Sequence, residues 1–222
     1  MIASMASVGL ASQGGRKPDP APIIDITATP VATSQAKVFA SPARVNDPEK
    51  AYNATFKTNK GDIVVKLATD TPETVNSFHF LASKGFYDNQ AFFYLDHTYW
   101  AQAGDPACNP DLDQTCTGTG DAGYKLPLEA GSQKHVKWAL VAPSVQGTAD
   151  EVSGGQFRVL FADDERLDGT ETVFGMVIEG QSILENAATL HLCTALTQQE
   201  SGCAEDFTDA IIIEDVVVAP SS

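Results

Sequence analysis

The sequence predicts a mainly β protein: a closed antiparallel barrel whose ends are covered by two helices, preceded by an extended arm. Three observations lead to this fold class. Short runs of apolar residues, many of them alternating with polar ones, recur from residue 52 onward between turn-forming residues, which is the pattern of β-strands. The 17 Gly and 12 Pro residues favour a turn-rich β protein over a bundle of helices. Two segments have helical periodicity, and many short strands with two helices are typical of a barrel with covered ends.

The chain has 222 residues, which favours one domain of ordinary size with some additional sequence, because a domain usually holds about 100 to 200 residues. Residues 1–50 are rich in Pro, Ala, Ser and Thr and have no sustained strand or helix period. They are predicted to form an extended arm or linker, because they cannot bury enough apolar surface to fold alone. Residues 51–222 are predicted to form the barrel domain.

The barrel is expected to begin with a β-hairpin at residues 54–68, where two alternating runs are joined by turn residues at 59–62. Further short strands are expected along the rest of the chain. They are predicted at residues 91–95, 100–104, 137–142, 156–162, 172–178 and 210–219.

An amphipathic helix is expected directly after the hairpin. Thr71 is its predicted N-cap, Pro72 takes the first helical position, and Gly85 ends it. One face of this helix is apolar and consists of Val75, Phe78, Leu81 and Ala82. A second, shorter helix is predicted at residues 181–189.

The charge of the chain is strongly acidic. It has 29 Asp and Glu against 14 Lys and Arg, a formal net charge of −15. Nucleic acid is therefore not expected as a partner, since phosphate binding needs clustered cations. The excess is interpreted as a contribution to solubility. No stretch approaches the roughly 20 apolar residues of a membrane-spanning helix, so no span is expected.

The four cysteines form two local pairs, Cys108 with Cys116 and Cys193 with Cys203. Each pair brackets a polar stretch, which is typical of a disulfide that closes a surface loop outside the cytosol. Four Cys allow three pairings, of which the local one is favoured. Zinc is the weaker interpretation, because these separations are wider than those of structural zinc sites.

The sequence thus predicts an extracytoplasmic protein, which is periplasmic, secreted or on the cell surface. The amino-terminal residues 1–15 lack the basic region and long apolar run of a secretory signal. Either export is directed by something outside this sequence or the disulfide interpretation is wrong.

Other chemical sites are not supported by the sequence. Asn109, Asp111 and Asp113 alternate as in a calcium loop, but the required Gly and Glu are missing, which favours a solvated turn. His79, His97 and His135 have no Ser, Cys or Asp at a recognisable spacing, so no hydrolase triad is indicated. Neither a metal nor a cofactor is expected.

Several segments, in this order, resemble the cyclophilin family of β-barrel peptidyl-prolyl cis-trans isomerases over about residues 53–218. They are "TNKGDIVVKL", "LASKGFYDN", "QAGDP", "GTGDAGY", "GGQF" and "LDGTETVFGMVIEG". The resemblance implies an eight-stranded barrel, proline-containing peptides as ligands, and catalysis without metal or cofactor. The cysteine pair in the glycine-rich loop and the proline-rich leader are similar to those of exported bacterial members.

The resemblance also implies which residues line the substrate groove. Tyr94 stands where the family has its catalytic arginine, and Arg158 stands where a phenylalanine forms the floor of the proline pocket. Arg166 stands where a tryptophan or another bulky residue is common. The other groove positions are Tyr99 for a phenylalanine, Trp100 for a methionine, the retained Gln102, Ala142, Gln156 and Leu167, and Glu171 for a histidine.

These departures bear on activity. A tyrosine hydroxyl is a neutral donor, and charge-assisted hydrogen bonds are about twice as strong as neutral ones. Arg158 in an apolar pocket needs a counter-charge, so an ion pair with Glu171 or Asp96 is expected. Three interpretations of Arg158 stay open: it fills a disused pocket, it replaces the lost arginine from across the groove, or it forms a new pocket for an acidic or polar partner.

The favoured functional hypothesis is a cyclophilin-like domain with weak or lost isomerase activity. It would act as a protein-binding or structural module, with the arm joining it to a larger assembly. The alternative is an active isomerase that assists the folding of exported proteins and uses Tyr94, Tyr99 and Gln102 in altered form.

Overall fold

The computed structural model describes residues 37–112, 116–192 and 206–221. All of them belong to one compact unit, Ser34–Ser222. The predictions for residues 1–36, for Asp113 and for the Cys193 and Cys203 pair lie outside the described residues.

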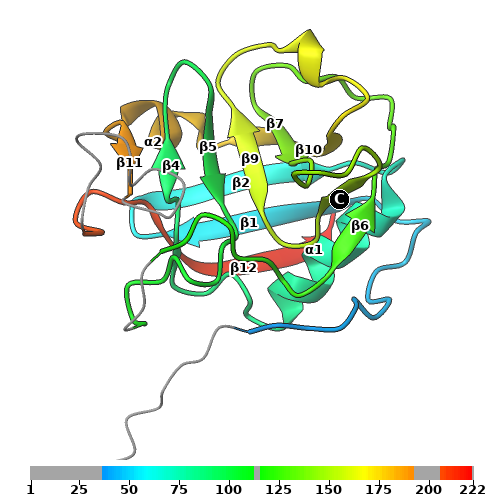
Figure 1. Ribbon diagram of the computed structural model, residues 1–222, viewed down its shortest axis with the longest axis horizontal. Helices are drawn as coiled ribbons and strands as arrows, with labels where there is room; N and C mark the ends of the chain where they lie inside the picture. The colour runs from blue at the N-terminus through cyan, green and yellow to red at the C-terminus, as the bar shows by residue number, and fades with distance from the viewer. Residues whose placement is uncertain (1–36, 113–115, 193–205, 222) are drawn as a thin grey trace, which may run out of the picture. The chain divides into compact units, whose positions relative to one another are not determined.

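The described chain is mainly β (Figure 1). Its strands are β1 Tyr52–Thr58, β2 Gly61–Leu67, β3 Gln90–Ala91, β4 Tyr94–Leu95, β5 Trp100–Ala103, β6 Lys125–Pro127, β7 Ala139–Ala142, β8 Glu151–Ser153, β9 Phe157–Leu160, β10 Thr172–Glu179, β11 Leu190–His191 and β12 Ile212–Pro220. Its helices are α1 Pro72–Ser83 and α2 Gln181–Asn186, with one 3-10 turn, η1, at Glu165–Leu167.

The main sheet closes on itself. Its strand order is β11-β4-β5-β9-β7-β10-β2-β1-β12-β3, with every pairing antiparallel, and β6 and β8 form a separate pair. Between β3 and β4 the chain changes partners: the Phe92 amide donates to the Ile211 carbonyl at 2.9 Å, and the Phe93 amide donates to the Gln102 carbonyl at 3.0 Å. With β3 and β4 counted as one kinked strand, eight of the described strands encircle the barrel, and β11 is added beside β4. The predicted mainly β fold with two helices is confirmed, and the predicted closed eight-stranded barrel is compatible with this sheet.

The first hairpin forms where expected, because its strands alternate and its turn residues suit a reversal. Ala54 and Phe56 of β1 and Ile63 and Val65 of β2 point into the core. Gly61 has φ of 122°, a backbone conformation that favours glycine.

Helix α1 begins at Pro72 as predicted, but its amino-terminal capping differs. The Thr71 side chain makes no capping hydrogen bond. Instead the Glu129 carboxylate accepts from the amides of Glu73 at 3.0 Å and Thr74 at 2.8 Å. A carboxylate suits this position, since it bonds two free amides and complements the helix dipole. Glu129 lies far away in the sequence, so no local pattern indicated it.

The interior of the barrel is filled with aromatic side chains. The ring of Phe157 on β9 lies 5.2 Å from that of Phe56 on β1 and 6.2 Å from that of Phe78 on α1, measured between centroids. Helix α1 lies at the lower right of the barrel in Figure 1 and α2 at its upper left. Helix α2 is shorter than predicted, because Ala187 is already extended, with φ of −66° and ψ of 147°.

The described part of the predicted arm contacts the domain. Phe39 packs against Phe80 of α1 with ring centroids 5.2 Å apart, and its amide donates to the Ala122 carbonyl at 2.7 Å. The Asn76 side chain accepts from the Val45 amide at 2.9 Å. Residues 37–50 are therefore held against the barrel, while the division of the chain at residue 50 stays a prediction.

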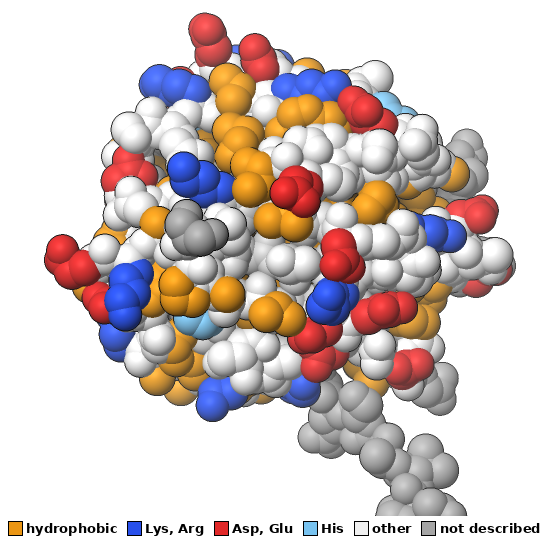
Figure 2. Space-filling view, turned by 180° about the vertical axis from the view of Figure 1, so that it is seen from behind, with side chains coloured by type: hydrophobic (Ala, Val, Ile, Leu, Met, Phe, Trp, Pro, Cys, Tyr) orange, Lys and Arg blue, Asp and Glu red, His pale blue; other side chains and the backbone are white. Residues whose placement is uncertain are grey.

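Charged side chains are dispersed over the surface. On the face shown in Figure 2, Lys and Arg are scattered among Asp and Glu, so the described part of that face has no continuous basic surface. Neither of the helices in the described chain is long and apolar enough to cross a membrane.

Candidate functional site

Three neighbouring strands bring the central groove residues together. In the register of the sheet, Tyr94 of β4 lies opposite Gln102 of β5, and Gln102 lies opposite Arg158 of β9. Residues directly opposite each other share a face of the sheet. The three side chains therefore form one row across the barrel surface, as the resemblance implied.

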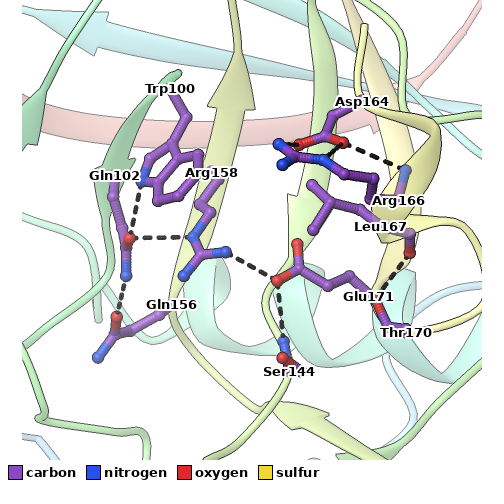
Figure 3. A network of polar contacts seen from close by, with 10 residues as sticks. All are labelled: Trp100, Gln102, Ser144, Gln156, Arg158, Asp164, Arg166, Leu167, Thr170 and Glu171. Atoms are coloured by element: carbon purple, nitrogen blue, oxygen red, sulfur yellow. Dashed lines mark hydrogen bonds and ion pairs between the residues drawn. The ribbon is translucent and has the colours of Figure 1, made fainter. Parts of the chain in front are cut away.

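Arg158 is the centre of a polar network (Figure 3). Its Nη1 donates to Glu171 Oε1 at 2.7 Å, and its Nε donates to Gln102 Oε1 at 3.0 Å. The guanidinium also stacks on the Trp100 ring, with Cζ 4.3 Å from the centroid. The expected ion pair with Glu171 is confirmed. The other suggested partner, Asp96, accepts from the Thr98 amide at 2.8 Å instead.

The ion pair is largely removed from solvent. The Arg158 side chain is 19% exposed and that of Glu171 only 3%. Burial lowers the pKa of Arg158, and the adjacent Glu171 carboxylate opposes this shift. Glu171 Oε1 also accepts from the Ser144 amide at 3.4 Å, whereas Oε2 is buried with no hydrogen-bond partner among the described residues. Leu167 is joined to Glu171 through the backbone, since the Glu171 amide donates to the Leu167 carbonyl at 3.3 Å, and its side chain packs against a small apolar cluster that includes Val141.

The two groove glutamines continue the network. Gln102 Nε2 donates to Gln156 Oε1 at 2.7 Å, and Gln156 Nε2 donates to the Gly120 carbonyl at 2.6 Å. Gln102 Oε1 also accepts from Trp100 Nε1 at 3.2 Å. A continuous chain of hydrogen bonds therefore runs from Glu171 to the glycine-rich loop.

Tyr94 is packed in an aromatic column. Its ring stacks on His191 of β11, with centroids 4.4 Å apart and an interplanar angle of 9°, and lies 5.8 Å from the Trp100 ring. Sequence reasoning missed His191, because β11 has two residues and too short a run to show strand periodicity.

The remaining predicted groove residues differ in exposure. Tyr99 is 52% exposed and packs against Trp100, with ring centroids 5.7 Å apart. Ala142 is buried at the end of β7. Arg166 turns away from the network, since its Nε and Nη2 bond the Asp164 carboxylate at 2.8 and 2.7 Å.

A pocket of about 310 Å³ lies beside Arg158. Its lining residues are Gln102, Gly118, Thr119, Gly120, Asp121, Pro143, Ser144, Val145, Gln146, Ser153, Gln156 and Arg158. The sequence indicated the glycine-rich side of this pocket, but not the opposite side at residues 143–146. Those residues follow a buried strand and have no motif of their own.

The glycine-rich loop is fixed from within. The predicted Cys108–Cys116 disulfide is present. The buried Asp105 accepts from the Thr117 hydroxyl at 2.7 Å and the Gly120 amide at 3.0 Å. A Cβ at Gly120 would lie 2.0 Å from Asp105 Oδ1, so any other residue there would have to displace this buried carboxylate. This bracing holds the loop carbonyls in place for Gln156.

The described residues contain no cluster of three or more His, Cys, Asp or Glu side chains that could hold a metal ion. Asn109 and Asp111 instead form a turn, in which the Asp111 amide donates to Asn109 Oδ1 at 2.8 Å. The network can supply hydrogen bonds from amides and a guanidinium, together with aromatic surface.

Known proteins with the same organisation are cyclophilins. The family model described as "Cyclophilin type peptidyl-prolyl cis-trans isomerase/CLD" matches residues 53–218. A peptidyl-prolyl cis-trans isomerase of Helicobacter pylori strain 26695 is 35% identical over 141 residues, covering 61% of this chain and 80% of that protein. One of Synechococcus elongatus is 31% identical over 131 residues, covering 59% and 83%.

The likeness extends to solved structures. A crystal structure of a Cryptosporidium parvum cyclophilin type peptidyl-prolyl cis-trans isomerase matches with a TM-score of 0.61 and 23% identity, covering 78% of this chain and 99% of that one. The family match spans the barrel and the network built around Arg158. The chain belongs to the cyclophilin-type peptidyl-prolyl cis-trans isomerase family.

Proposed function

We propose that this cyclophilin domain has weak or lost isomerase activity and acts as a protein-binding or structural subunit outside the cytoplasm. The observation that carries the proposal is the Arg158–Glu171 ion pair, at 2.7 Å between Nη1 and Oε1. It stands at the groove positions that the resemblance assigns to the proline pocket.

Catalysis of prolyl isomerisation requires tight binding of a twisted amide. The barrier to rotation is about 18–20 kcal/mol, and a catalyst lowers it by binding the twisted form better than either planar form. Tyr94 is a neutral donor at the position of the family's arginine, and its ring is stacked on His191. Loss of one preorganised donor costs about 10²- to 10³-fold in rate.

Binding of a proline ring at this place is also opposed. The ring would have to displace the Arg158 guanidinium from Glu171, whose side chain is 3% exposed. An unpaired buried carboxylate costs several kcal/mol. A proline-directed ligand would have to offset this loss before it gained any contact energy.

The alternative, an active isomerase, is supported by one observation. Arg158 Nε donates to Gln102 at 3.0 Å, so a cation is present beside a retained groove glutamine. In this alternative Tyr94, Tyr99 and Gln102 serve in altered form, and Arg158 supplies the missing cation from across the groove.

Isomerisation assays on a proline-containing peptide separate the two. We expect wild-type turnover to be at least about tenfold below that of an ordinary cyclophilin measured alongside. Both the binding of the proline ring and the hydrogen bond donated to the twisted amide are weakened. The double variant Tyr94→Arg with Arg158→Phe should gain activity. Arg44→Met, which changes an arginine paired with Glu73 on α1, is the control and should change nothing.

Turnover within about tenfold of the ordinary cyclophilin would contradict the proposal. Ordinary turnover that is lost in Tyr94→Phe, or in Arg158→Met shown to be folded by thermal unfolding, would establish the alternative.

The proposed location has separate support. The Cys108–Cys116 disulfide is typical of proteins in oxidising compartments. Association through the amino-terminal arm stays a prediction, since residues 1–36 of the arm lie outside the described ones and residues 37–50 contact the barrel of the same chain.

A further inference from the structure

The first described segment of the chain, residues 37–46, forms a strap that runs beside helix α1 (Figure 1). At one end of the strap, Lys37 Nζ donates to the carbonyl oxygens of Lys84 at 3.1 Å and Gly85 at 2.5 Å. Carbonyl groups at the carboxyl end of a helix have no partners within the helix and favour a cation. This end of the strap is therefore bonded to the carboxyl end of α1.

The other end of the strap is bonded to the amino-terminal half of α1. The buried Asn76 side chain donates to the Ala43 carbonyl at 3.1 Å and accepts from the Val45 amide at 2.9 Å. Because a side-chain amide is both donor and acceptor, these two bonds fix the position of the strap on the helix. The Arg44–Glu73 pair is about half exposed on both sides, so it contributes little and the strap does not depend on it.

Phe39 joins the strap to the glycine-rich loop, residues 118–124. Its ring packs on Phe80 of α1, with centroids 5.2 Å apart, and its amide donates to the Ala122 carbonyl at 2.7 Å. A Cβ at Gly123 would lie 2.5 Å from the Phe39 carbonyl oxygen, and Gly123 has φ of 98°. The backbones of the strap and the loop are thus in direct contact, and a side chain at residue 123 would have to push them apart.

The glycine-rich loop carries one end of the polar network of the groove. The Gly120 carbonyl accepts from Gln156 Nε2 at 2.6 Å, and the Gly120 amide donates to the buried Asp105 at 3.0 Å. At the end of the loop, the Tyr124 hydroxyl lies 2.8 Å from that of Ser77 on α1. Between these two points the loop backbone is bonded to the strap.

We propose that Phe39 is a positioning residue for the groove. Through its bond to Ala122 the strap sets the place of the glycine-rich loop, and with it the place of the Gly120 carbonyl that accepts from Gln156. Because Ala122 is only two residues from Gly120, a shift of the loop at the strap moves that carbonyl as well. The inference goes beyond the proposed function, and it holds whether or not the groove retains turnover.

Hydrogen exchange and NMR of the full chain test this inference. Phe39→Ala should raise the exchange rate of the Gly120 amide at least about tenfold more than that of the Val65 amide in β2, because the loop loses its hold on the strap. It should also shift the side-chain amide resonance of Gln156, which reports the hydrogen bond to Gly120. Thermal unfolding checks that each variant is folded.

Two further variants make the test specific. Phe207→Ala is the matched control, since it removes another partly buried phenylalanine that packs against the same core but lies outside the strap and the loop. It should not raise the exchange of Gly120 more than that of Val65. Asn76→Ala releases the strap without changing Phe39 or the loop, and it should affect Gly120 and Gln156 in the same direction as Phe39→Ala.

The inference is overturned if folded Phe39→Ala and Asn76→Ala keep the wild-type exchange of Gly120 and the wild-type resonance of Gln156. Asp105 and Tyr124 would then hold the loop unaided. It is equally overturned if Phe39→Ala raises exchange by the same factor at Gly120 and Val65, because the strap would then contribute only to overall stability. If Phe39→Ala does not fold, Asn76→Ala decides alone.

Discussion

Arg158 is held by partners of three kinds: the Glu171 carboxylate, the Gln102 amide and the Trp100 ring. Each compensates part of the cost of placing a charge where only 19% of the side chain is exposed. The Arg and Glu substitutions are therefore coupled, since either one alone would leave an unpaired charge.

A double-mutant cycle measures this coupling. Arg158→Met or Glu171→Met alone should lower the free energy of unfolding by about 3–5 kcal/mol, because each leaves its partner's charge uncompensated. The double variant should lose less than the sum of the two. Urea unfolding of the four proteins gives the values, and strict additivity would show that the pair is not coupled.

Asp168 is a second residue whose negative charge is stabilised by hydrogen bonds of the folded chain. Its carboxylate accepts from His135 Nδ1 at 2.8 Å, from Lys134 Nζ at 2.9 Å and from the His135 amide at 3.3 Å. These hydrogen bonds, that of the His135 side chain first, lower the pKa of Asp168 well below its ordinary value.

The lowered pKa predicts a pH-dependent contribution to stability. A depressed folded-state pKa stabilises the fold above the ordinary Asp value of about 3.9, and this contribution is lost as the pH falls further. The difference in unfolding free energy between wild type and Asp168→Asn should be largest near neutral pH and shrink below about pH 4. Urea titrations at several pH values test this, and a difference that grows on acidification would contradict it.

Residue identity gave much of the site in advance. The pairing of Arg158 with Glu171 was predictable, because both residues replace uncharged ones at groove positions of the cyclophilin family and carry opposite charges. His191 and Ser144 did not follow, because their roles depend on backbone placement: one stacks from a two-residue strand, the other contributes an amide and a pocket wall.

At the scale of elements, long periodic segments were predictable and short ones were not. The hairpin of β1 and β2 and the helix α1 were expected from period and turn residues. β6 and β8, with three residues each, were not, because three residues do not show a period. The carboxylate that bonds the first amides of α1 comes from Glu129, and contacts between distant segments leave no local signal.

The glycine-rich loop and its disulfide form one element whose stability is testable. The bridge between Cys108 and Cys116 spans a sequence separation of 8. In the loop-entropy model a bridge of this length contributes about 2.5 kcal/mol. The double variant Cys108→Ala with Cys116→Ala should lose about that much in urea unfolding, and an unchanged midpoint would show that Asp105 alone holds the loop.

At the scale of the whole molecule, the described residues before β1 belong to the packed unit. Phe39 contacts α1, and the Asn76 side chain bonds the backbone of residues 43 and 45. A deletion of residues 1–50, chosen from composition alone, would remove these contacts together with the arm.

Two truncated proteins measure how much residues 37–50 contribute to the stability of the barrel. Protein starting at residue 51 should be less stable than protein starting at residue 37 by about 2–4 kcal/mol, because an aromatic contact and buried hydrogen bonds are lost. Thermal and urea unfolding compare the two, with Phe39→Ala in the full chain as a matched control. Equal stabilities would mean that residues 37–50 contribute nothing to the stability of the barrel.

The partner exchange at Phe92 and Phe93 makes a single covalent segment the seam of the cylinder. The barrel closes there without pairing of two separate edge strands, because β3 and β4 belong to one continuous segment of chain. The amide hydrogens of Phe92 and Phe93 should consequently exchange with solvent only when the whole barrel unfolds. Their hydrogen-exchange rates would then report the free energy of global unfolding.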